Sequence, residues 1–128
     1  MKIEISRPLF LSIEVLEVDE NIPSFRIEMK ISVNQFQNYF QYTGEFWIKC
    51  DEWDSFEKNL EFNSESINSF QDIDEDMRLT IHLDELTWSV KKVSKFTNQD
   101  ISLIFRATIN DDEFSSIFRE FSDFPKWW

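Results

Sequence analysis

The chain has 128 residues, 41% hydrophobic and 16% aromatic, which is enough to build one domain with its own core, without a disulfide or a metal. Its 25 acidic and 13 basic side chains give a net charge of −12, which repels nucleic acids and anionic membranes. One cysteine excludes an intrachain disulfide, and neither a signal-peptide core nor an apolar run of roughly 18 residues is present, so we expect a cytoplasmic protein.

In the first half, alternation of apolar and polar residues predicts three strands, at residues 9–15, 25–33 and 38–49, with a turn at 19–23. In the third strand, one face holds Phe40, Tyr42, Phe46 and Ile48, and the opposite face holds Tyr39 and Trp47. The period then changes, because Trp53, Phe56 and Leu60 recur at helical spacing. We expect a helix over residues 52–61 with Asp51 as its N-cap.

The second half begins with a polar stretch, residues 63–76, which is typical of a loop. Alternation then predicts strands at 77–83, 86–90 and 101–109, with a turn at 97–100. A closing amphipathic helix is expected over residues 112–122, capped by Asn110 or Asp111; its apolar positions are Phe114, Ile117, Phe118 and Phe121.

The order of elements is therefore βββα, twice. When residues 51–56 are aligned with residues 112–117, Ile48 falls against Ile109 and Leu60 against Phe121. Short links favour antiparallel pairing, so we predict one α+β domain over residues 1–128, a mostly antiparallel sheet with both helices on one face. The predicted core includes Phe56, Leu60, Ile27, Ile31, Phe105 and Phe118.

No pattern predicts a catalytic, cofactor or metal site. Asp72, Asp74 and Asp76 are spaced like the first ligands of a calcium loop, but that loop needs Gly where Met77 stands and Glu where Leu83 stands. His82 is the one histidine, which excludes a multi-histidine metal site. A nucleophile–base pair of Cys50 and His82 is an open alternative without a supporting signature.

The sequence favours instead a surface that binds another protein. The densest acidic run holds Asp72, Asp74, Glu75 and Asp76, and a solvated charge run of this kind suits a cationic partner. Tyr39 and Trp47 are aromatic candidates for the same role, and the alternative is that Trp47 and the terminal Trp127 and Trp128 pack into the fold.

Taken from residue 9 to residue 128, the order of elements resembles that of small immunity proteins of the WapI type, which protect bacteria from toxins. The resemblance includes the long alternating strand at 25–33, the acidic-capped helix at 51–60, and the ending Phe121-Ser122-Asp123-Phe124-Pro125. Where family members often carry Asp-Ala-Asn-Trp, this chain has residues 20–24, Glu-Asn-Ile-Pro-Ser. The resemblance implies toxin binding, no enzymatic activity, and no particular site residues.

We therefore expect an immunity-type inhibitor that occludes a cognate bacterial toxin, for example a basic nuclease whose groove an acidic partner can fill in place of phosphates. The alternative is a small-ligand-binding or enzymatic domain that uses the open sheet face, and a third interpretation is an adaptor domain. A deep, dry pocket lined by Cys50 or His82 would favour the enzyme. No cofactor, nucleic acid or membrane is expected as a partner, and the sequence does not indicate an oligomeric state.

Overall fold

The computed structural model describes residues 2–62, 67–82 and 84–128. The predicted loop residues 63–66 and the predicted strand position 83 lie outside the described residues. The first half contains β1 (Lys2–Ile5), β2 (Phe10–Asp19), β3 (Ser24–Gln35), β4 (Asn38–Lys49) and α1 (Cys50–Phe62). The second contains β5 (Asn68–Gln71), β6 (Met77–His82), β7 (Glu85–Val93), β8 (Asp100–Thr108) and α2 (Asp111–Ser122).

The strands form two antiparallel sheets of four, in the orders β1-β2-β3-β4 and β5-β6-β7-β8. The α+β class, the antiparallel pairing and the repeat are confirmed. Each repeat is nevertheless ββββα, and the chain makes two sheets where one was expected. The extra strands are β1 and β5, and β5 lies within the stretch predicted to be a loop. Its one apolar residue, Phe70, is fully buried, but three polar neighbours hide this strand from the alternation test.

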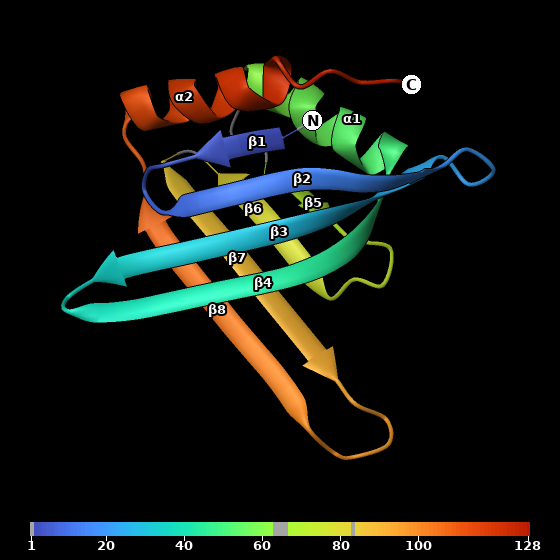
Figure 1. Ribbon diagram of the computed structural model, residues 1–128. Helices are drawn as coiled ribbons and strands as arrows, with labels where there is room; N and C mark the ends of the chain where they lie inside the picture. Colours follow the sequence, from blue (N-terminus) through green and yellow to red (C-terminus); the bar gives the residue numbers. More distant parts are fainter. Residues whose placement is uncertain (1, 63–66, 83) are drawn as a thin grey trace.

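The two sheets lie face to face, with strands crossing at an angle (Figure 1). Their inner faces meet at Tyr42 of β4 and Trp88 of β7, whose ring centroids are 5.0 Å apart. The Trp88 indole also donates to the Met29 sulfur of β3 at 3.2 Å. The inner faces of both sheets thus belong to one continuous hydrophobic core.

Both helices lie along the side of the sandwich where β1 and β5 lie (Figure 1). Each helix packs on the first strand of the other half, α1 on β5 and α2 on β1. Between them, Trp53, Phe56, Phe70 and Phe121 form an aromatic cluster with centroid distances of 4.9 to 6.3 Å. Neither helix in the described parts of the chain has the length and apolar character to cross a membrane.

The predicted core is confirmed at four of its six positions, Phe56, Leu60, Ile27 and Ile31, which are all buried. It is wrong at Phe105 and Phe118, which are only partly buried against the core. In α2 the fully buried residues are Ile117 and Phe121, so the neighbour of the predicted core residue Phe118 takes its place in the core. In β8 the partial exposure arises because the strand runs out beyond the facing sheet (Figure 1).

The helix starts differ between the halves. Asn110 caps α2, as predicted, in a reciprocal capping box: its side chain accepts from the Glu113 amide at 2.8 Å, and the Glu113 carboxylate accepts from the Asn110 amide at 3.1 Å. The predicted cap Asp51 is wrong, because α1 begins at Cys50 directly from β4, and the Cys50 amide donates to the Pro23 carbonyl at 2.9 Å.

Candidate partner-binding site

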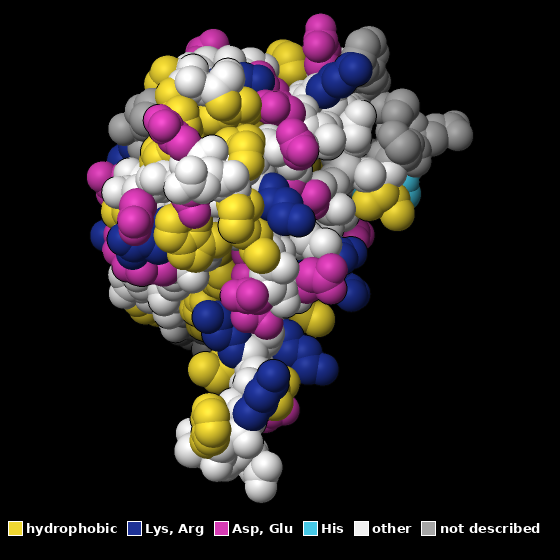
Figure 2. Space-filling model, turned by 90° about the vertical axis from the view of Figure 1, so that its right-hand side faces the viewer, with side chains coloured by type: hydrophobic (Ala, Val, Ile, Leu, Met, Phe, Trp, Pro, Cys, Tyr) yellow, Lys and Arg dark blue, Asp and Glu magenta, His cyan; other side chains and the backbone are white. Residues whose placement is uncertain are grey.

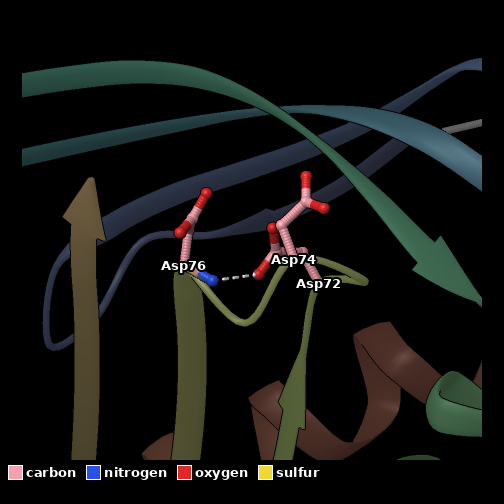
Figure 3. A group of neighbouring side chains, drawn as sticks. All are labelled: Asp72, Asp74 and Asp76. Atoms are coloured by element: carbon pink, nitrogen blue, oxygen red, sulfur yellow. Dashed lines mark hydrogen bonds between the residues drawn. The ribbon is translucent and has the colours of Figure 1, made fainter. Parts of the chain in front are cut away.

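The acidic run forms a tight connection between β5 and β6, in which Asp72 is the organising residue. Its Oδ1 accepts a hydrogen bond from the backbone amide of Asp76 at 2.8 Å (Figure 3) and another from the backbone amide of Met77 at 2.9 Å. The Glu75 backbone takes a left-handed conformation with φ of 61°, and its amide donates to the Asp72 carbonyl. The connection is thus held by its own backbone bonds.

Asp72 is 5% exposed, which corrects the expectation of a solvated, partner-facing carboxylate at this position. The physical reason is that its side chain turns inward to pair two amides that the turn leaves without partners. Burial raises the pKa of the Asp72 carboxyl, against the lowering effect of the two amides. Asp72 therefore braces the loop, and the accessible charge belongs to its neighbours.

Those neighbours are Asp74 and Glu75, which are exposed, and Asp76, which is half-buried. The carboxylates of Asp72, Asp74 and Asp76 offer oxygens within 4.8 Å of one another, and Asp74 and Asp76 extend on the side of the loop that β4 crosses (Figure 3). In the described part of the chain this is the one group of three or more His, Cys, Asp or Glu side chains close enough to share a cation. Because Asp72 Oδ1 already accepts two backbone amides, these hydrogen bonds explain why the three carboxylates lie close together, and no bound cation is needed.

The loop joins the other sheet at Trp47. The Ile73 amide donates to the Trp47 carbonyl at 2.8 Å, which holds the acidic loop against the edge of β4. Trp47 is half-buried on the outer face, and Ile73 is 42% exposed. A shallow cavity of about 90 Å³ lies beside them, lined by Lys49, Glu52, Gln71, Asp72, Ile73 and Glu75. The structure thus brings one predicted aromatic residue together with the predicted acids.

Tyr39 lies elsewhere. It shares the outer face of β4 with Trp47 but is eight positions away, about 26 Å along the strand. Its side chain is 65% exposed beside the turn that joins β3 to β4. Tyr39 therefore does not belong to the surface made by the acidic loop and Trp47. Sequence reasoning missed Ile73, whose exposure could be suspected only because polar residues flank it on both sides.

Cys50 and His82 are the two side chains that the alternative of an enzyme depends on. Cys50 is 4% exposed, and burial, followed by Asp54 and Asp51, raises the pKa of its thiol. A buried protonated thiol is a weak nucleophile. His82 is half-buried at the end of β6, opposite Glu85 of β7. A cavity of about 410 Å³ between β1 and α2 is lined by charged and polar residues, including Arg7, Arg119 and Glu113, and by neither Cys50 nor His82.

Of the two terminal tryptophans, Trp128 packs against the core, whereas Trp127 contacts the Phe25 ring but remains 36% exposed. Trp128 stacks on Phe25 with a centroid distance of 5.2 Å, and its indole donates to the Asp54 carboxylate at 2.8 Å. Lys126 pairs with the same carboxylate at 3.0 Å. The tail after α2 is thereby held against α1.

Comparisons with family models, with curated proteins and with solved structures found no match to this chain. The geometry and charge of the chain itself are therefore what bear on its function.

Proposed function

We propose that this protein is an immunity-type inhibitor that binds and occludes a cognate toxin, and that the surface formed by Asp74, Glu75, Asp76, Ile73 and Trp47 contacts it. The observation that carries the proposal is the attachment of the acidic loop to β4 through the Ile73–Trp47 backbone bond. It brings the loop that carries the accessible carboxylates and the exposed Ile73 against the backbone of Trp47.

Electrostatics supports a basic partner. A net charge of −12 attracts a cationic protein over long range, and a local run of acids orients it at the last step. A toxin that acts on nucleic acid carries a basic groove for phosphates. Carboxylates held in a fixed turn can occupy that groove, which blocks substrate entry without any chemical step. The resemblance in element order to WapI-type immunity proteins points to the same role.

Packing supports an interface at the same place. Interfaces concentrate their binding energy in a few aromatic residues surrounded by contacts that exclude water. Trp47 is half-buried and Ile73 is 42% exposed, so both side chains offer apolar area to a partner.

The first test is the association rate with the toxin encoded beside the gene. We expect the triple change Asp74→Asn, Glu75→Gln and Asp76→Asn to slow association about tenfold at low salt, and the difference to vanish at high salt. Asp72 is left intact, because its carboxylate accepts the two amide bonds that brace the turn. The matched control removes three exposed acids elsewhere, by Glu14→Gln, Glu20→Gln and Glu61→Gln. Equal slowing by both triples would reduce the loop to a share of the net charge.

The second test separates the two aromatic residues of β4. Trp47→Ala should weaken binding by about 2 kcal/mol or more, as at an interface hot spot, whereas Tyr39→Ala should leave affinity unchanged. Circular dichroism and thermal melts of the free protein check that Trp47→Ala still folds, and Trp47→Phe provides a milder variant. Affinity lost at Tyr39 and kept at Trp47 would move the interface to the far end of the strand. No binding to the neighbouring toxin would reject the proposed function.

A further inference from the structure

Of the four sheet edges, two are covered by helices, one is covered at a single position, and one has no backbone partner outside its own sheet in the described residues. The edges β1 and β5 are four residues long, and each is covered by a helix. The third edge, β4, accepts the Ile73 amide at Trp47 and is bordered there by the acidic loop. The fourth edge, β8, is nine residues long, and among the described residues no backbone hydrogen bond joins it to any segment other than β7.

The β8 edge also lacks several of the features that usually prevent strands from pairing, although Asp100 and Arg106 are charged. It contains no proline and no lysine, and its register with β7 runs from Thr108 to Asp100 without a bulge. Each face exposes a large apolar side chain: Ile104 is 63% exposed on the outer face and Ile101 is 55% exposed on the inner face. Beside the inner face an apolar groove of about 290 Å³ is lined by Val33, Phe40, Trp88, Leu103, Ile104 and Phe105.

Charge is divided along the ribbon made by β7 and β8. Its tip carries Lys91, Lys92 and Lys95, and the projecting end of the molecule in Figure 2 shows such basic side chains among hydrophobic ones. Its base carries exposed acids, Asp84 and Glu85 before and at the start of β7, and Asp111 and Asp112 at the start of α2. The two ends are separated by about 30 Å, the length of a nine-residue strand.

We propose that β8 pairs with β8 of a second copy of this chain, antiparallel about a two-fold axis at Leu103. Antiparallel pairing sets the basic tip of each ribbon beside the acidic base of the other, whereas parallel pairing would set like charges together. Register about Leu103 places Asp100 opposite Arg106 of the second copy, twice, on the outer face. On the inner face it places Ile101 opposite Phe105 of the second copy, twice.

The charge of the β7–β8 ribbon makes this edge the most favourable place for two copies of the chain to meet. Two chains of net charge −12 repel each other, but between residues 91 and 106 the chain has four basic side chains and one acidic, so repulsion is least here. An isologous contact also closes after two copies, which avoids open-ended strand stacking. The pairing would join the two β5-β6-β7-β8 sheets into one sheet of eight strands.

The first experiment is light scattering of the full chain across a concentration series at low salt. We expect the mass to rise from 15.5 kDa toward twice that value, and to fall back as salt is raised. Leu103→Cys should form a disulfide dimer under mild oxidation, because residues at the axis face each other. The parent protein is the control, since its one cysteine, Cys50, is buried. A chain that stays monomeric throughout, or a dimer that crosslinks through Ile104→Cys and not Leu103→Cys, overturns the proposed pairing.

A charge exchange tests whether opposite charges hold the two ribbons together, without relying on one folded variant. One variant reverses the tip by Lys91→Glu and Lys95→Glu, and the other reverses the base by Asp84→Lys and Glu85→Lys together with Asp111→Asn and Asp112→Asn. Each alone should be monomeric, because its tip and base then carry the same sign. Mixed together they should form a heterodimer, since each tip again meets an opposite base. Lys92 is left unchanged because its ammonium lies 5.5 Å from the Phe46 ring. Absence of a heterodimer from two folded variants overturns the proposal.

Discussion

The two halves of the chain build the same ββββα unit but end it differently. Equivalent helix positions do equivalent work: Phe56 and Ile117 are buried, and so are Leu60 and Phe121. The last strand of each unit differs. Phe46 of β4 is buried, whereas its equivalent in β8, Ala107, is half-buried; Tyr42 of β4 and its equivalent Leu103 are both half-buried. The comparison shows that a repeated unit can keep its core while its edge strands diverge.

The connections differ in the same way. The β5–β6 turn of the second half is braced by the buried Asp72, and it also covers the edge of β4 in the first half. The second half receives no such cover for β8 in the described residues. The edge strand of the first unit, β4, therefore lies beside the acidic loop. The edge strand of the second unit, β8, belongs to the β7–β8 ribbon with the basic tip.

The largest expected effect tests whether the two helices contribute equally to the shared core. Phe121→Ala should lower the free energy of unfolding by about 3–5 kcal/mol, because Phe121 is fully buried between Trp53, Phe56 and Phe70. The equivalent Leu60→Ala should cost about 2–5 kcal/mol. Urea melts measure both values.

Phe118→Ala is the internal control, since Phe118 is only half-buried one turn earlier in the same helix. Its loss should be clearly smaller than that of Phe121→Ala. If Phe118→Ala and Phe121→Ala lower the free energy of unfolding equally, the assignment of the buried face of α2 is wrong. The equivalence of the two helices would then be wrong as well.

Much of the fold could be predicted because its long elements have strong periods. β3 and β4 alternate over twelve residues each, and Phe114 to Phe121 repeat at helical spacing. The four-residue strands β1 and β5 could not be recognised, because so short a segment holds only one or two apolar residues. Two sheets were mistaken for one because alternation reports which face is buried and not what buries it.

The next effect tests the brace that distinguishes the second half. Asp72→Ala should lower the free energy of unfolding by about 1–3 kcal/mol, because it leaves the buried amides of Asp76 and Met77 without an acceptor. Asp72→Asn keeps an acceptor oxygen and removes the charge, so its unfolding free energy at pH 7 should equal or exceed that of the parent. Matching losses in both variants would mean that the charge, and not the acceptor, stabilises the turn.

A smaller effect compares the two helix starts. Asn110→Ala should cost about 1 kcal/mol, because it removes the capping box of α2. Asp51→Ala should cost less, since Asp51 is in the first turn of α1 and contributes only through the helix dipole. Thermal melts of both variants, measured together, report the difference. An equal loss at Asp51 would show that α1 also depends on a side-chain cap.

The site could be predicted only in part. The acidic run is visible in the sequence, but the inward turn of Asp72 depends on which backbone amides the turn leaves unpaired. The partnership of Trp47 with the loop depends on a bond between residues 26 positions apart, Ile73 and Trp47, which no local pattern encodes. Tyr39 shares a face with Trp47 by alternation, yet distance along β4 separates them.

The smallest effect is the pH dependence of the brace. Burial raises the pKa of Asp72 in the folded state above the ordinary value of a carboxyl group. A raised pKa means that the folded chain holds this proton more tightly than the unfolded chain does. The stability contributed by Asp72 is therefore fully present below the ordinary carboxyl pKa, and it is lost as the pH rises through the raised pKa.

The free energy of unfolding of Asp72→Asn should accordingly exceed that of the parent most at neutral pH. This difference should shrink as the pH is lowered through that window. Urea melts of both proteins across the acidic range measure the difference, and Asp74→Asn, which removes an exposed carboxylate of the same loop, controls for the general relief of negative charge. An advantage of Asp72→Asn that grows on acidification would show that its two amide bonds, and not burial, dominate the ionisation of Asp72.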